Sequence, residues 1–101
     1  MRLFFSQVLT IAAKDLRGLA CTGHGKGLYL WGRDGRPARP GIVSTDSRAA
    51  AITAAWNRDG TSRRAFEKTC QSVLACQPVA LLRWIKDNEP GVLEATRWIF
   101  G

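Results

Sequence analysis

One short stretch of this chain combines glycines with polar side chains in the way that ligand-binding loops do. Residues 22–27 read TGHGKG. The three alternating glycines allow the backbone to approach a ligand closely, while His24 and Lys26 add polar tips. The stretch is not a Walker phosphate-binding loop, because in that motif the lysine leads into a helix, whereas an apolar, strand-like segment follows Lys26. Spacing alone leaves two interpretations open, a tight structural turn and a loop that contacts a ligand.

His24, Asp46 and Arg48 are polar residues that could carry chemistry. His24 is the only histidine of the chain, so Ser–His or Cys–His catalysis would have to use it. No G-x-S-x-G elbow or reactive-cysteine signature accompanies it, which favours a solvent-facing histidine in a turn. Asp46 has two interpretations, a helix N-cap and a functional carboxylate, and its local chemistry favours the cap. Arg48 either pairs with Asp46 or faces solvent.

The cysteines do not predict a bridge or a metal site. Cys21, Cys70 and Cys76 are odd in number and form no C-x-x-C pair. We therefore expect inert thiols, no bound metal and a reducing compartment, the cytoplasm. No stretch approaches the roughly 20 apolar residues that a membrane span requires, so no membrane partner is expected.

Hydrophobic periodicity predicts the elements that must position these residues. A helix is expected over residues 1–15. Three strands should follow, over 17–22, 28–31 and 41–44. From Thr45 or Asp46, either of which could be the N-cap, the period becomes helical as far as Trp56. Further helices are expected over 62–70, with Thr61 or Ser62 as its cap, and over 78–88, followed by a helical turn over 92–95 and a strand over 97–100.

The order of these elements predicts the α/β class, with a small mixed sheet and several helices. A chain of 101 residues has room for about one domain. The predicted apolar helix begins at Met1 and the last apolar strand stops at Gly101, so both ends look interrupted. We expect 1–101 to be a single partial domain, an incomplete fragment. The open edge of its sheet would permit self-association.

The charge balance favours anionic partners. Fifteen Lys and Arg face eight Asp and Glu, which gives a net charge of +7. The basic residues are scattered, however, and the sequence has no basic run of five or six, which disfavours nucleic acid as the partner. A small basic nucleic-acid-binding or interaction module without catalysis is kept as the alternative function. That alternative predicts salt-dependent retention on heparin or DNA.

Four blocks of sequence, in order, carry a resemblance to a known family. They are GLACTGHGKGLYLW, DGRPARPGIVSTDSRA, AWNRDG and QPVALLRWIKDNEP. Together they resemble the N-terminal domain of the FGGY-type carbohydrate kinases, and most closely the L-xylulose kinase-like members. The resemblance runs from Arg17 to Phe100, over four fifths of the chain.

The resemblance implies a partial ribonuclease H-like fold, as in actin and hexokinase, with a sugar bound against this domain. The implied sugar-binding positions are Gly25, Lys26, Asp46, Arg48, Cys76 and Gln77. Gly25 and Lys26 replace the Arg-Glu of polyol kinases and the Met-His of D-xylulose kinases, and Ser44 replaces a frequent tryptophan. Because a lysine only donates hydrogen bonds, a keto-pentose such as L-xylulose or a sugar-acid derivative is the implied substrate.

The resemblance also implies a parent enzyme that uses ATP and Mg²⁺ to phosphorylate a sugar hydroxyl. In the family, an Asp-x-Gly-Thr hairpin, a later Gly-x-Asp segment with the catalytic base and a second domain handle the nucleotide. None of them has a counterpart in this sequence. We therefore expect no catalytic residue here, no cofactor bound by this chain alone, and dependence on the remainder of the kinase.

Overall fold

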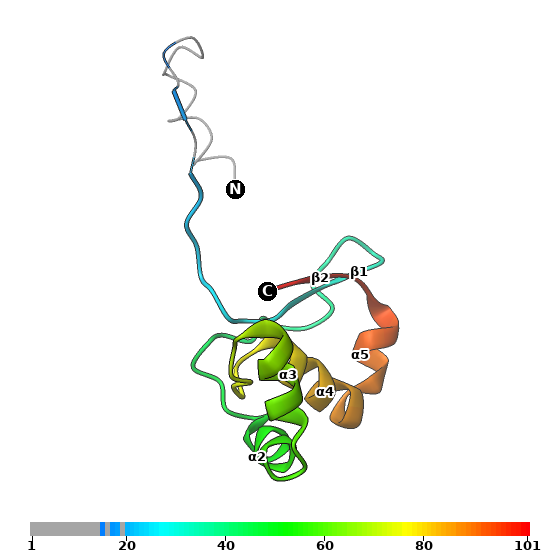
Figure 1. The fold of residues 1–101 in the computed structure, drawn as a ribbon. Coiled ribbons are helices and arrows are strands. Elements are labelled where there is room, and N and C mark those ends of the chain that lie inside the picture. The colour runs from blue at the N-terminus through cyan, green and yellow to red at the C-terminus, as the bar shows by residue number, and fades with distance from the viewer. Residues whose placement is uncertain (1–14, 16, 19) are drawn as a thin grey trace.

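The computed structural model describes residues 15, 17–18 and 20–101 (Figure 1). The helix expected over residues 1–15 lies almost wholly outside them. The elements of the described residues are, in chain order, strand β1 (Tyr29–Gly32), helices α2 (Ala50–Arg58), α3 (Thr61–Thr69), α4 (Pro78–Asn88) and α5 (Pro90–Ala95), and strand β2 (Thr96–Phe100).

The sheet of the described residues joins the first and the last of their elements, β1 and β2. β1 and β2 pair antiparallel, and Leu30 lies opposite Ile99 in the register. Figure 1 shows β2 along β1, above the helices. Side chains alternate across β1 as a strand requires, so Leu30 is buried while Tyr29 and Trp31 are exposed. The strands expected over 28–31 and 97–100 are confirmed, each within about a residue.

The core lies between this sheet and α4. The fully buried apolar residues are Leu28, Leu30, Ile42, Ala49, Ala80, Leu81 and Ile85. Leu81 and Ile85 are one helical turn apart, and their spacing places both on the inward face of α4. Trp56 and Trp84 pack against this core, as their apolar helix faces predict.

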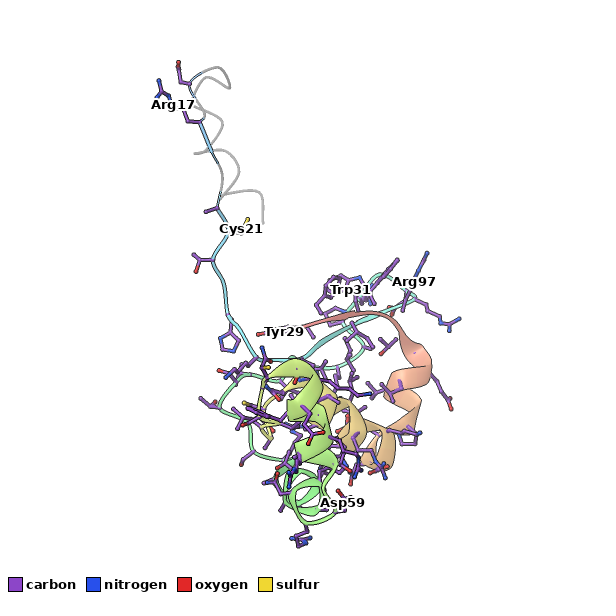
Figure 2. The ribbon with its side chains drawn as sticks, viewed as in Figure 1. Arg17, Cys21, Tyr29, Trp31, Asp59 and Arg97 are labelled. Atoms are coloured by element: carbon purple, nitrogen blue, oxygen red, sulfur yellow. The ribbon has the colours of Figure 1, made fainter. Side chains whose placement is uncertain are left out.

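The other two tryptophans lie outside the core. Trp31 and Trp98 face each other in the register of β1 and β2, and their side chains are exposed on the outer face of the sheet. Tyr29 and Phe100 continue the same face. The guanidinium of Arg97 lies 5.4 Å from the centre of the Trp98 ring. Figure 2 shows Tyr29, Trp31 and Arg97 along this strip, away from the helices.

Two expected strands are wrong. The described residues of 17–22 are exposed and form no strand, because no described segment lies beside them to supply ladder hydrogen bonds. Figures 1 and 2 show this part of the chain leading away from the body. In the segment 41–44 only Ile42 pairs, through two 2.9 Å backbone hydrogen bonds with Leu28. The chain then turns at once, since the Asp46 N–H donates to the carbonyl of Val43.

The expected N-caps of α2 and α3 are wrong, whereas α4 and α5 lie where they were expected. α2 begins at Ala50, and neither Thr45 nor Asp46 caps it. The Asp46 carboxylate accepts the Arg48 N–H instead, which fixes a turn in place of a first helical turn. α3 begins at Thr61 itself after Gly60, so neither expected cap is used. The remaining two helices are confirmed: α4 spans 78–88, and α5 begins at Pro90, just before the expected turn.

Substitution of Leu81 by alanine tests the core. Because its side chain is fully buried, we expect the free energy of unfolding to fall by about 2–5 kcal/mol in urea denaturation. Val79→Ala, two residues away on the exposed side of α4, is the matched control and should cost less than about 0.5 kcal/mol. Equal losses in the two variants would contradict the packing of α4 under the sheet.

Candidate functional site

Three segments that are distant in sequence meet at one end of the sheet. They are the loop before β1, the start of α4 and the residue that follows β2. Together with one face of α3 they line an open cavity of about 690 Å³. A volume of this order is typical of small-molecule sites. Lys26 and Gln77, two of the six residues expected to bind a sugar, both line it.

Close backbone approaches hold these segments together. A Cβ atom added to Gly101 would lie 2.8 Å from Cγ of Pro78 and 3.3 Å from the carbonyl oxygen of Gly27. A Cβ added to Gly27 would lie 2.7 Å from the carbonyl oxygen of Ile42. The absence of a side chain at Gly101 therefore leaves the space in which the end of β2 meets Pro78 and the loop, and that at Gly27 leaves the space in which the loop meets Ile42.

Lys26 has a backbone conformation that side-chain-bearing residues seldom adopt. Its φ is +57°, in the left-handed region. Hydrogen bonds on both sides hold the loop: Leu28 pairs with Ile42, and the Ser44 N–H donates to Nε2 of His24 at 3.1 Å. His24 is exposed, as its turn position predicts. A strained residue that is held from both sides is typical of functional loops.

The side-chain amide of Gln77 has a fixed orientation. Gln77 precedes the first residue of α4, and its Oε1 atom accepts the Leu74 N–H at 3.0 Å. Because a backbone N–H can bond only to the oxygen of the amide, Nε2 is left as the donor for a ligand. Cys76, the preceding residue, is half-buried, and neither it nor Gly25 is among the residues that line the cavity.

Asp46 and Arg48 form a separate cluster. The Arg48 guanidinium donates from Nε and Nη2 to the two carboxylate oxygens of Asp46, each at 2.9 Å. It also lies 5.0 Å from the centre of the Trp84 ring on α4. Neither residue lines the cavity. The pair therefore fastens the 44–48 loop to α4, and through the Ser44–His24 hydrogen bond that loop touches the glycine-rich segment.

This pairing sets the electrostatics of the loop. The pKa of Asp46 is lowered, chiefly because its carboxylate accepts side-chain hydrogen bonds from Arg48. The same hydrogen bonds raise the pKa of Arg48. Burial opposes both shifts but is the smaller effect. The pair is therefore charged at neutral pH.

The aromatic wall of the cavity was not predicted as part of a site. Trp56, on α2, was expected only as a core anchor, yet it also lines the cavity. Thr61, Ala65 and Thr69 line it from α3, spaced four residues apart on one helix face. Their spacing marks a common face, but only the packing of α3 shows that this face meets Lys26.

The described residues do not fit a magnesium–nucleotide site. Among them, no group of three or more His, Cys, Asp or Glu side chains is placed to hold a metal ion. Among the residues that the structure describes, no Asp or Glu side chain lines the cavity, whereas Mg²⁺ in nucleotide sites binds carboxylates and phosphates. In the described part of the chain, no helix has the length and hydropathy of a membrane span.

Comparison with known proteins identifies the fold and the family of the chain. Two solved structures share the fold. A gluconate kinase from Lactobacillus acidophilus superposes with a TM-score of 0.78 at 18% identity, over 96% of this chain and 20% of that one. A ligand-bound xylulose kinase from the same organism gives a TM-score of 0.80 at 18% identity, over 99% and 20%. The chain thus shares the fold of part of each of these two sugar kinases.

Sequence comparison identifies the family. The family model described as "FGGY family of carbohydrate kinases, N-terminal domain" matches residues 1–101. The L-xylulose/3-keto-L-gulonate kinase of Escherichia coli (strain K12) is 34% identical over 79% of this chain, and a probable L-xylulose kinase of Pasteurella multocida (strain Pm70) is 30% identical over 79%. The chain belongs to the FGGY family of carbohydrate kinases. It spans 16–17% of the length of these two relatives.

Neutralising Asp46 tests the role of its ion pair. Because the pKa of Asp46 is lowered in the folded chain, its stabilisation is present above the ordinary carboxyl pKa of 3.8 and is lost as the pH falls through the folded-state pKa. We expect Asp46→Asn to lower the free energy of unfolding by about 1 kcal/mol at pH 7. This cost should vanish well below pH 3.8. Urea denaturation at several pH values measures it.

Asp87→Asn is the matched control for this experiment. Asp87 pairs with Arg83 one turn away on α4, where both side chains are about half exposed. Its loss should cost only a few tenths of a kcal/mol. A cost of Asp46→Asn that stayed the same at pH 7 and pH 2.5 would show that its charge does not stabilise the loop.

Proposed function

We propose that this chain supplies part of the sugar-binding side of an ATP-dependent carbohydrate kinase, which transfers a phosphoryl group to a sugar hydroxyl. The observation that carries this proposal is the shared cavity of Lys26 and Gln77. Sequence resemblance points to these two positions, 51 residues apart in the numbering of the chain, and folding brings them to the same open cavity. Membership of the FGGY family supports the same function.

The walls of the cavity suit the two kinds of surface that a sugar presents. Trp56, Pro78 and Val79 offer apolar surface for the C–H face of the sugar. Lys26 and Gln77 offer N–H donors for its oxygen atoms. We propose a keto-pentose such as L-xylulose or a sugar-acid derivative as the substrate, in line with the names of the relatives in Escherichia coli and Pasteurella multocida.

Asp46 and Arg48 act on this site through the loop that they hold. Their ion pair fixes the segment whose Ser44 N–H binds His24. His24 is two residues from Lys26, so the pair helps to keep the strained loop in place. Asp46 and Arg48 are therefore positioning residues in this proposal. The described residues place no Asp, Glu or His side chain at the cavity that could act as the base for the sugar hydroxyl.

A titration monitored by ¹H–¹⁵N NMR tests this function. L-Xylulose should shift the backbone amides of Lys26, Gln77 and Gly101 with a dissociation constant in the millimolar range at best, about −4 kcal/mol of binding free energy. Gln77→Glu keeps the oxygen that accepts the Leu74 N–H and removes the two amide donors. We expect it to weaken binding about three- to tenfold, the effect of a lost hydrogen bond.

An assay of ADP release completes this test. With ATP, Mg²⁺ and sugar, the 101-residue chain should show no turnover, because its described residues do not fit a magnesium–nucleotide site. Sugar-dependent ADP release would contradict the proposal that the chain supplies only a sugar-binding part. Amide shifts confined to residues outside the cavity would contradict the site itself.

A further inference from the structure

Four aromatic residues are exposed together on the outer face of the sheet. In the register, Trp31 lies opposite Trp98, and Tyr29 lies opposite Phe100. Between 36% and 55% of the surface of each residue is exposed, and the four line one open pocket of about 640 Å³. They form an aromatic strip. Because large aromatic side chains dominate binding interfaces, a contiguous exposed group of four indicates a binding surface.

The strip offers flat rings at a regular interval. Side chains on one face of a strand recur every two residues, about 7 Å apart. This interval separates Tyr29 from Trp31 on β1. It also separates Trp98 from Phe100 on β2. The bases of a nucleic-acid single strand can be spread apart and stacked one by one on such rings, whereas the bases of a duplex stack on each other. The strip therefore suits a single strand.

Two arginines adjoin one end of the strip. Arg33 and Arg97, with Thr96 between them, line an open pocket of about 390 Å³. The Arg33 N–H donates to the carbonyl of Ala95 at 3.2 Å, which holds the two chain segments together at this point. The Arg97 guanidinium lies 5.4 Å from the centre of the Trp98 ring. The arginines and the strip therefore form one surface, and Figure 2 shows part of it.

The charge of these two arginines is available to a ligand. The ion pairs found in the described part of the chain include neither of them. Asp34, in the turn after β1, accepts the Arg36 N–H at 3.0 Å and lines neither pocket. Guanidinium groups bind phosphate well, and a net charge of +7 attracts polyanions over longer distances. The surface thus combines rings that suit bases with charges that suit phosphates.

We infer that the aromatic strip and the two arginines bind single-stranded nucleic acid, with bases stacked on Trp31 and Trp98 and phosphate groups bound by Arg33 and Arg97. The scattered basic residues of the sequence disfavoured this partner, because only the pairing of β1 with β2 brings these arginines together beside the rings. None of the described residues lines both this surface and the proposed sugar cavity. The two proposals can therefore be tested separately.

Fluorescence anisotropy with a labelled oligothymidylate of about twelve nucleotides tests this inference. We expect the full chain to bind the single strand at least about tenfold more tightly than the corresponding duplex with oligoadenylate, because paired bases cannot stack on the strip. The affinity should fall with added NaCl, with a slope of about −1.4 in log–log form for two phosphate contacts. In NMR titration the amides of β1 and β2 should shift.

Matched variants show whether these residues cause the binding. Trp98→Ala removes one ring and should weaken binding at least about fivefold, whereas Phe66→Ala removes a half-exposed ring from α3 and should change the affinity less than about twofold. Arg97→Gln leaves every ring in place and should reduce the salt slope by about 0.7. Arg58→Gln removes the same charge from the end of α2 and should leave the slope unchanged. Thermal denaturation shows which variants are folded.

The other occupants of this surface give different results. Equal affinities of the unchanged chain, Trp98→Ala and Arg97→Gln for the oligonucleotide would overturn the inference. Thymidine monophosphate bound as tightly as the oligonucleotide would make a free nucleotide the ligand. Cellohexaose bound as tightly would instead assign the strip to a neutral sugar chain. A dimer in size-exclusion chromatography that Trp98→Ala dissociates would assign it to a second copy of the chain, and each of these results contradicts binding of a single strand.

Discussion

The antiparallel pairing of β1 with β2 is the constraint on which the site depends. It joins the first and the last element of the described residues and carries Gly101 to the side of Pro78 and Gly27. The sheet can take this place because Leu30 buries its side chain against α4, where Leu81 is also buried. Loss of the pairing would remove one wall of the cavity, although Lys26 and Gln77 lie outside both strands.

Ion pairs fasten the connecting loop to the same helical layer. Asp46 and Arg48 bind each other and contact α4 through Trp84. Arg39 reaches Glu89, the residue between α4 and α5, through a 2.9 Å ion pair in which its side chain is 14% exposed. The 39–48 segment is thereby tied to α4 at two points. It in turn supports the glycine-rich loop, so contacts outside the cavity determine the position of Lys26.

The sequence pattern predicted a helix or strand correctly where the residues of that element alone determine its structure. Pro78 and the apolar stripe that follows it were sufficient to predict α4. The segment 41–44 could not be predicted in the same way, because its hydrophobic pattern does not show that only Ile42 finds a partner. Asp46 was misread as a cap because capping and a local turn use the same carboxylate chemistry. Resemblance indicated Lys26 and Gln77, but that Trp56 faces them follows only from the packing of α2 and α3.

The central claim is that one sugar molecule occupies the cavity between Lys26 and Gln77. Nuclear Overhauser effects between the ligand and the protein test it most directly, because they report which side chains lie within a few ångströms of the bound sugar. With L-xylulose, the account predicts effects from the same carbon-bound protons to the Trp56 ring and the Val79 methyl groups. Effects to the rings of Trp31 and Trp98 alone, on the exposed outer face of the sheet, would contradict it.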